Sequence, residues 1–327
     1  MKNHKMLGIA SVLLAAGMIA PVILVLTLKE GREYIKKDWD DILRVTFVCP
    51  ISSGDEYWKA AFQGMQDAAE EIGNIDVNMV GPEKIDSEWI GAFDTAIAAR
   101  VQGIISTGTS EKVETKISEA AREKIPVVLI DTDIPDSDRI CYIGLDNFKL
   151  GSDGGEFIAR QTGGKAQIAV ISLGEQALNF IDRTKGLQSV VEQYPEMEIV
   201  VSEIAGNSLE AAKTAAQILE EYPQVDTFFC IDGTTPKGVA QKIKELKLEN
   251  EILCLGLSSD TEILERIEDG SLDATIDLQP YAMGYQAVKN LDAYHRGEQP
   301  EEIVIPDTIL VTEENVQEFQ RKKDTKM

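Results

Sequence analysis

Short apolar runs alternate with longer amphipathic segments from about residue 43 almost to the end of the chain. The short runs have the length of β-strands, and the longer segments place apolar residues at helical spacing. Nearly continuous apolar runs such as IPVVLID and EILCLGL favour strands that are covered on both faces. This alternation is typical of βαβ units, and it predicts an α/β fold with parallel sheets.

We expect two series of five strands. The first series comprises Val45 to Cys49, Asp76 to Val80, Gly103 to Ser106, Pro126 to Ile130 and Cys141 to Gly144. The second comprises Gln167 to Ser172, Ile199 to Glu203, Thr227 to Ile231, Ile252 to Leu257 and Asp273 to Ile276. Residues 101–133 and 225–260 share one order of strand, Gly-Thr turn, helix, apolar strand and acidic turn. Two similar lobes are therefore predicted, and a length of 327 residues suits two domains.

The N-terminal segment between Lys5 and Lys29 contains no ionisable side chain. It is long enough to cross a hydrocarbon layer roughly 30 Å thick as a helix. A buried core helix and a cleaved signal peptide are the alternatives, but a signal peptide usually has an apolar region of only about 7 to 15 residues. We expect an uncleaved transmembrane anchor at residues 1–28 and a linker at residues 29–42. Lys2 and Lys5 precede the segment and mixed charges follow it, so the positive-inside rule places the rest of the chain outside the cytoplasm, held at the cell membrane by one span.

The chain is strongly acidic, with 56 Asp and Glu against 32 Lys and Arg and a formal net charge of −24. Such a surface repels the phosphates of nucleic acids and of anionic lipids. We therefore expect no nucleic-acid partner.

Few residues suggest catalysis or metal binding. Each of the four cysteines lies in a short apolar run and is expected to be buried, and none has zinc-ligand spacing. Of the two histidines, His295 is expected at the surface near a helix end. Asp131 to Asp138 (DTDIPDSD) lacks the glycine and glutamate of a calcium loop, so we interpret it as a turn with solvated acids. No metal, cofactor or nucleophile–base pair is predicted, and binding is favoured over catalysis.

Several stretches together resemble the type I periplasmic sugar-binding proteins, the ribose-binding-like receptors of ABC transporters. These are FQGMQDAAEEIG, IPVVLIDTD, YIGLDNFKLGSDGGEFIA, DRTKGL, CIDGTTPKGVAQKI, LERIEDGSLDATIDLQPYAMGYQAV and IPDTILVTEEN. The resemblance implies the type I periplasmic-binding-protein fold, in which two Rossmann-like lobes are joined by three crossings. The crossings would fall near residues 144–147, 278–280 and 307–309. An N-terminal lobe would then comprise 43–145 plus 279–308, a C-terminal lobe 146–278 plus 309–320, and a tail 321–327.

The resemblance also implies a ligand site between the lobes. Tyr57 and Trp58 match the family's paired aromatics, whose rings stack on a sugar, and Asp55 lies near a polar contact. Trp58 also belongs to the apolar stripe of its predicted helix, so packing is an equal alternative. Asp131 matches the family's acceptor after the fourth strand, with a strand-end turn as the alternative.

The resemblance also implies two site residues in the second half of the chain. Arg183 in DRTKG matches the arginine that donates to sugar oxygens, and its planar fork suits vicinal hydroxyls. A surface arginine in the first turn of a helix is the alternative. Asp232 stands where the family has Asn or Asp, and its alternative role is a helix N-cap.

Three positions depart from the family pattern. Thr132 replaces an arginine, Ser258 replaces an aspartate, and Gln279 is displaced by one position because Leu278 stands where a glutamine is usual. A buried polar ligand group left without a partner loses about 1 to 3 kcal/mol. An unchanged ribose pocket is therefore not expected, and either the ligand differs or Thr107, Thr109 and Asp260 compensate.

These observations predict a monomeric, non-enzymatic solute-binding protein that closes on a sugar or similar polyhydroxylated molecule and delivers it to an ABC permease. The alternative is a membrane-tethered sugar sensor that signals to a membrane histidine kinase. A transcription regulator of the lactose-repressor type shares the fold, but this chain has an apolar span in place of a DNA-binding head. That class is excluded.

Overall fold

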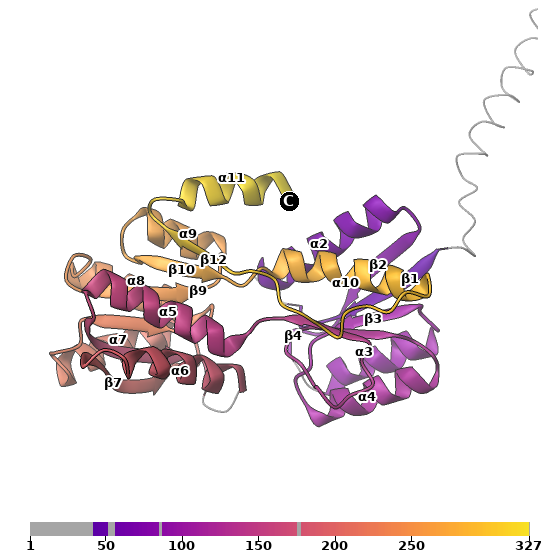
Figure 1. The fold of residues 1–327 in the computed structure, drawn as a ribbon, viewed down its shortest axis with the longest axis horizontal. Coiled ribbons are helices and arrows are strands. Elements are labelled where there is room, and N and C mark those ends of the chain that lie inside the picture. Colours follow the sequence, from indigo (N-terminus) through magenta and orange to yellow (C-terminus); the bar gives the residue numbers. More distant parts are fainter. Residues whose placement is uncertain (1–41, 52–55, 85–86, 175–177, 327) are drawn as a thin grey trace, which may run out of the picture. The chain divides into compact units, whose positions relative to one another are not determined.

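The computed structural model describes residues 42–51, 56–84, 87–174 and 178–326. The chain divides into a unit of residues 1–43 and a unit of residues 44–327, and the fold below is that of the second unit (Figure 1). The predicted anchor and almost all of the linker lie outside the described residues. Within the described ranges, no helix combines the length and apolarity that a membrane crossing needs.

The first sheet has six parallel strands in the order β11-β5-β4-β3-β1-β2. Their bounds are β1 Leu43–Val48, β2 Ile75–Val80, β3 Gly103–Ser106, β4 Val127–Asp131, β5 Cys141–Gly144 and β11 Ile303–Val304. The helices of this half are α2 Glu56–Ile72, α3 Ser87–Ala98, α4 Glu111–Arg122 and α10 Pro280–His295. Helices α3 and α4 pack together on one face, while α2 and α10 pack as a second pair (Figure 1).

The second sheet repeats this arrangement in the order β12-β10-β9-β8-β6-β7. Its strands are β6 Lys165–Ser172, β7 Glu196–Ile204, β8 Thr227–Cys230, β9 Leu253–Leu257, β10 Ala274–Asp277 and β12 Ile309–Thr312. Its helices are α5 Asn147–Thr162, α6 Leu178–Val191, α7 Ser208–Glu221, α8 Thr235–Leu246, α9 Thr261–Glu268 and α11 Val316–Lys326. The repeat predicted from the sequence is confirmed, because β3-α4-β4 and β8-α8-β9 occupy equivalent places in the two sheets.

All ten predicted strands are present, with ends that shift by no more than three residues. Two short strands were missed. β11 has two residues, and β12 pairs antiparallel with β10, so neither follows the βαβ rhythm on which the prediction rested. Because β11 lies in the first sheet and β12 in the second, the chain passes between the sheets at residues 305–308. It also passes between them after β5 and after β10.

Both sheets are covered by dense apolar cores. The buried side chains of the first half include Phe47, Trp89 and Phe93, and those of the second include Phe228 and Phe229. All four cysteines are buried, as expected. Side-chain caps set the start of several helices: for example, Asp146 accepts a hydrogen bond from the Lys149 amide at α5. His295 is the exposed last residue of α10, also as expected.

Glycines allow the paired helices to approach at backbone distance. A Cβ on Gly284 of α10 would lie 1.9 Å from the carbonyl oxygen of Ala61 in α2, and one on Gly64 would lie 2.1 Å from that of Tyr281. In the second half, a Cβ on Gly186 of α6 would lie 1.9 Å from the carbonyl oxygen of Phe148 in α5. Backbone atoms cannot yield as a flexible side chain can, so these glycines determine how closely the helices pack.

We expect Gly284→Ala to lower the free energy of unfolding by about 1 to 3 kcal/mol, since the added methyl group must push α10 away from α2. The matched control is Gly91→Ala in α3, where a Cβ meets nothing within 4 Å. That change should stabilise by about 0.5 to 1 kcal/mol through helix propensity. Urea denaturation of the three proteins tests this, and similar changes at both positions would contradict it.

Candidate functional site

The predicted site residues lie where strands end. Asp131 is the last residue of β4, Ser258 directly follows β9, and Asp232 and Gln279 come two residues after β8 and β10. Ligands of open α/β sheets bind at the carboxyl ends of parallel strands. The same end of the first sheet leads into α2, whose first turn carries two more predicted residues, Tyr57 and Trp58. Asp55 lies outside the described residues.

Backbone strain marks three of these positions. Among the described residues, six that are not glycine have a positive φ. Three of the six, Arg100, Lys124 and Lys247, follow helices, where a left-handed residue is an ordinary way to end a helix. The other three are Asp131 at φ 68°, Ser258 at φ 95° and Gln279 at φ 57°. Such strain, held at strand ends by the surrounding fold, is typical of functional sites.

Tyr57 and Asp131 form the centre of the first cluster. The Tyr57 Oη donates a hydrogen bond of 2.6 Å to Asp131 Oδ1, and Thr132 Oγ1 donates one of 2.8 Å to Oδ2. The Tyr142 hydroxyl supports the same residue from behind, through a 2.8 Å hydrogen bond to the Asp131 carbonyl oxygen. Burial, followed by the nearby Asp131 carboxylate, raises the pKa of Tyr57 well above its ordinary value, so the phenol remains a donor at neutral pH.

Arg183 is buried, so the alternative of an exposed arginine in a first helical turn is wrong. Its Nε donates to Asn147 Oδ1 at 2.9 Å, and its Nη1 donates to the Ile231 carbonyl oxygen at 2.8 Å. Burial lowers the pKa of Arg183, whereas the charges of Asp131, Tyr57 and Asp232 act in the opposite direction. Two hydrogen bonds therefore fix the orientation of the Arg183 guanidinium, which lies near the acidic groups at the strand ends.

Asp232 holds the turn that leads into α8. Its Oδ1 accepts hydrogen bonds from the amides of Thr234 and Thr235 at 2.6 and 2.8 Å, and its Oδ2 accepts one from the Thr235 hydroxyl at 2.7 Å. The N-cap position itself is occupied by Thr234, so the alternative of Asp232 as the N-cap is wrong. Burial raises the pKa of Asp232, and the helix contacts and Arg183 only partly offset this effect.

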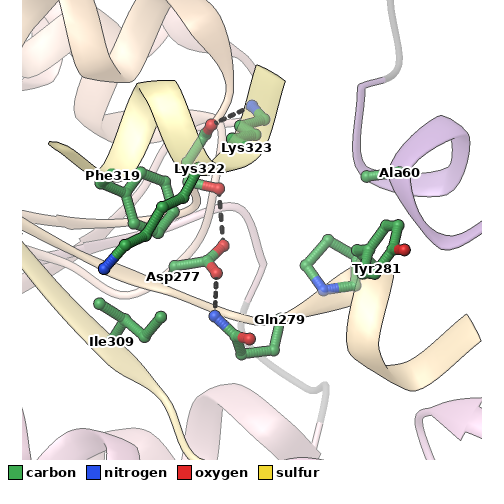
Figure 2. Close-up of a pocket in the computed structure, with 10 residues that line it drawn as sticks. Ala60, Asp277, Gln279, Tyr281, Ile309, Phe319, Lys322 and Lys323 are labelled. Atoms are coloured by element: carbon green, nitrogen blue, oxygen red, sulfur yellow. Dashed lines mark hydrogen bonds between the residues drawn. The ribbon is translucent and has the colours of Figure 1, made fainter. Parts of the chain in front are cut away.

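A second cluster surrounds the end of β10, as Figure 2 shows. The buried Asp277 accepts a 2.6 Å hydrogen bond from Ser259 Oγ and another from Gln279 Nε2. Lys323 Nζ of α11 donates to the Ser259 carbonyl oxygen at 2.5 Å. These groups border a cavity of about 140 Å³ whose remaining lining is largely apolar, with Ala60, Pro280, Tyr281, Ile309 and Phe319. The side-chain amide of Gln279 is therefore already hydrogen-bonded to the carboxylate of Asp277.

Trp58 packs against neighbouring aromatic rings. Its ring centroid lies 5.9 Å from that of Phe47 and 4.9 Å from that of Tyr57, and the Trp58–Tyr57 contact is edge-to-face. The residue is only partly buried, unlike Ala61 and Met65 on the same helix. The packing role is thus present, and the role in ligand binding stays a prediction.

The three possible compensating residues differ in their contacts. Thr107 is buried directly after β3, and its Oγ1 has no hydrogen-bond partner in the described part of the chain. Asp260, in contrast, caps α9 by accepting from the Ile263 amide at 3.0 Å and forms a 2.7 Å ion pair with Lys237. The Thr107 hydroxyl is therefore without a hydrogen-bond partner in the described residues, whereas the Asp260 carboxylate already has two partners. The compensating role of Thr109 stays a prediction.

Two features of the clusters were missed in the sequence. The sequence indicates Asn147, which orients Arg183, only as part of a predicted crossing, and it does not indicate Asp277 as a site residue. Asp277 does end an apolar strand, which is the signal that could have identified it. In DTDIPDSD, Asp133 is not a solvated acid, since it forms a double hydrogen bond with the buried Arg139 at 2.5 and 2.8 Å.

The chemistry of the site suits binding. It offers fixed donors, carboxylate acceptors and aromatic rings. No set of three His, Cys, Asp or Glu side chains in the described ranges is placed to hold a metal ion. The arrangement can hold a neutral ligand that both donates and accepts hydrogen bonds and has an apolar face for a ring.

Comparison with known proteins defines the class. Residues 45–299 match the periplasmic binding protein domain family. The structure resembles that of GanP, a glucose-galactose binding protein from Geobacillus stearothermophilus, with 30% identity, a TM-score of 0.77, and coverage of 84% of this chain and 98% of GanP. A sugar-binding protein of a sugar ABC transporter from Bacillus halodurans is similar, with 28% identity, a TM-score of 0.78 and the same coverage. So is a structure titled XylFII-LytSN complex, with 26% identity, a TM-score of 0.74, and coverage of 84% and 98%.

The chain is therefore an α/β solute-binding protein with two parallel-sheet lobes. It belongs to the periplasmic binding protein family, which confirms the resemblance found in the sequence. Since the family and these relatives are binding proteins, it is a binding protein and not an enzyme.

The raised pKa of Asp232 predicts a pH effect on stability. The folded state holds this proton more tightly than the unfolded state does, so the unfolding free energy falls as the pH rises from the ordinary pKa of an aspartate to the raised value. In Asp232→Asn this contribution is absent. The unfolding free energy of the variant minus that of the wild type should therefore increase with pH across this window.

Urea denaturation at several pH values from about 4 to 7 measures the difference. The comparison is Asp182→Asn, which removes a carboxylate with a 47% exposed side chain on α6. A difference for Asp232→Asn that stays constant or falls with pH would contradict the raised pKa of Asp232.

Proposed function

We propose that this protein is an extracytoplasmic receptor that binds a sugar or similar polyhydroxylated molecule between its two lobes and delivers it to an ABC permease. The observation that carries the proposal is that the hydrogen-bonded Tyr57 and Asp131, from the first half, lie near enough to the buried Arg183 of the second half for their charges to oppose the lowering of its pKa by burial. A sugar hydroxyl both donates and accepts, so it can use the carboxylate and the guanidinium at once.

The named relatives support the class of ligand. GanP is a glucose-galactose binding protein, and the Bacillus halodurans protein is the sugar-binding protein of an ABC transporter. The partly exposed Trp58 ring, beside Tyr57, supplies an apolar surface of the kind on which the face of a pyranose or furanose stacks.

Closure of the lobes is the proposed mechanism. Groups on both halves contact one ligand, so binding favours the arrangement in which they come together, and a membrane partner can recognise that arrangement. Arg183 is held by Asn147 and by the Ile231 carbonyl oxygen before any ligand arrives, so its donors need little further ordering.

The altered positions limit the choice of sugar. Thr132 and Gln279 already donate to aspartates of this chain, Asp131 and Asp277, and the Ser258 hydroxyl lies 3.4 Å from the Asp260 amide. They offer a ligand fewer charged contacts than the arginine and aspartate usual in ribose receptors. We therefore propose a pocket whose specificity differs from that of a ribose receptor, with the buried Thr107 hydroxyl as an added contact.

We expect at least one monosaccharide to raise the melting temperature of the full chain. A ligand at about 100 times its dissociation constant stabilises by roughly 2.7 kcal/mol. Arg183→Lys should weaken the binding of that sugar by about 10- to 100-fold, because a charge-assisted hydrogen bond is worth roughly 1.5 to 3 kcal/mol. Differential scanning fluorimetry across a sugar panel, then calorimetric titration, measures both effects.

The matched control is Lys185→Gln on the same helix, whose side chain is 63% exposed and pairs with Asp182. It should bind as the wild type does. Tyr57→Phe should also weaken binding while both cores stay folded. Failure of every sugar to stabilise the protein, or unchanged binding in both site variants, would reject the proposal.

A second candidate is a membrane-tethered sugar sensor. One similar structure is a complex of XylFII with LytSN, so a protein of this fold is found in association with another protein. The proposed single-span anchor at residues 1–28 favours this reading, because it would hold the lobes beside a partner such as a histidine kinase. The lobes would then lie on the extracytoplasmic side of the cell membrane.

Mass spectrometry of the protein extracted from membranes should find residues 1–28 still attached. Retention is expected because the apolar segment is longer than the usual signal peptide and no clear cleavage site ends it. A mature N-terminus beyond Leu28 would remove the support for the tethered sensor and leave the receptor of an importer.

A further inference from the structure

A group of cations lies at the opposite end of the first sheet from the candidate site. Arg44 directly precedes Val45 in β1, Arg100 and Gln102 precede β3, and Lys124 precedes β4. Since Val45 is in register with Gly103, and Ile104 with Val127, these residues stand side by side at the amino ends of neighbouring strands.

Backbone contacts fix this group, which we call the basal cluster: Arg44, Arg100, Arg122, Lys124 and His295. The Gln102 amide donates to the Arg44 carbonyl oxygen at 2.8 Å, and His295 Nε2 lies 2.6 Å from the Gln102 carbonyl oxygen. All members except Arg44 line a hollow of about 430 Å³, in which Glu123 is the only acidic residue.

The charge of the basal cluster is unusual for this chain. Acids outnumber bases by 56 to 32, and lysines and arginines elsewhere form many ion pairs with them. In contrast, all members of the cluster are exposed, and within the described ranges none of its four Lys and Arg residues lies in an ion pair with a carboxylate.

Helix ends explain part of this arrangement. Helices α3 and α4 end at the base, where carbonyl groups favour cations, and Arg44 Nη2 donates to the carbonyl oxygens of Ala99 and Arg100 at 3.5 and 3.3 Å. The Arg122 Nε donates to its own helix. These contacts account for the presence of cations but leave their excess charge facing solvent.

The chain enters the compact unit at this same end. Residue 43 begins β1, and it follows the linker and the uncharged segment that we propose as the membrane anchor. We propose that the basal cluster is a docking surface for the headgroups of anionic phospholipids. This inference rests on the proposed anchor, and it adds that the first lobe has a preferred orientation on the membrane.

The acidity of the whole chain does not prevent this contact. Charges further apart than about 8 Å are largely screened at physiological ionic strength, so the local excess of cations decides the interaction at the membrane surface. The sequence-based expectation of repulsion from anionic lipids therefore holds for the surface as a whole but not for its base. In the docked orientation the carboxyl ends of the strands, with the candidate site, point away from the bilayer.

The test uses the full chain in phosphatidylcholine nanodiscs with and without phosphatidylglycerol. A donor dye on Gln299→Cys, an exposed position four residues beyond His295, reports energy transfer to acceptor lipids, since the native cysteines are all buried. We expect anionic lipid to raise the transfer by about twofold or more, and about 1 M salt, where the Debye length is roughly 3 Å, to abolish the rise.

Charge reversal at the base, Arg100→Glu with Arg122→Glu and Lys124→Glu, should remove the rise. The matched control reverses Lys149, Arg160 and Lys185 on the second half, each with a 63% exposed side chain, and should keep it. If the reversed protein fails to fold by circular dichroism, the corresponding Gln substitutions replace it and should reduce the rise.

Equal transfer in both lipids, or equal loss in the two charge-reversed proteins, overturns the docking surface while leaving the anchor intact. A wild-type chain that does not enter phosphatidylcholine discs overturns the anchor itself. Inorganic phosphate that reduces the transfer more than chloride of the same ionic strength would assign the hollow to a free anion and reject the lipid.

Discussion

The buried guanidinium of Arg183 is the constraint on which the candidate site depends. A buried charge is tolerated only when it is hydrogen-bonded and compensated. In this chain two hydrogen bonds hold the group within its own half, while the carboxylate of Asp232, in the same half, is hydrogen-bonded at the start of α8. Part of the compensation comes from Asp131 at the end of β4 in the other half. The charge of Arg183 is therefore compensated from both lobes, at the place where the proposed ligand would bind.

The fold could be predicted from the chain because its pattern is local and repeated. Runs such as IPVVLID identify covered parallel strands, and all ten were found with small shifts at their ends. The two missed strands are short and depend on partners distant in sequence: β11 pairs with β5, and β12 lies antiparallel to β10. No local pattern indicates such pairing.

The site could be predicted only in part, for a different reason. The family resemblance supplied Asp131, Asp232 and Ser258, and the structure places each of them at the carboxyl end of a strand, the first in one sheet and the other two in the second sheet. Their hydrogen-bond partners could not be predicted, since the choice between a ligand contact and an internal one depends on distances of a few tenths of an ångström. Asp232 shows this well: the same carboxylate that matches a family contact also accepts three hydrogen bonds from the residues at the start of α8.

The last helix, α11, contacts the second cluster of the candidate site. Lys323 of α11 reaches the Ser259 carbonyl oxygen, and the Ser259 side chain donates to the buried Asp277. Residues close to the C-terminus thus contact the strand end at which a ligand is expected to sit. Substitutions in α11 would therefore change groups that border this cavity while leaving Tyr57, Asp131 and Arg183 in place.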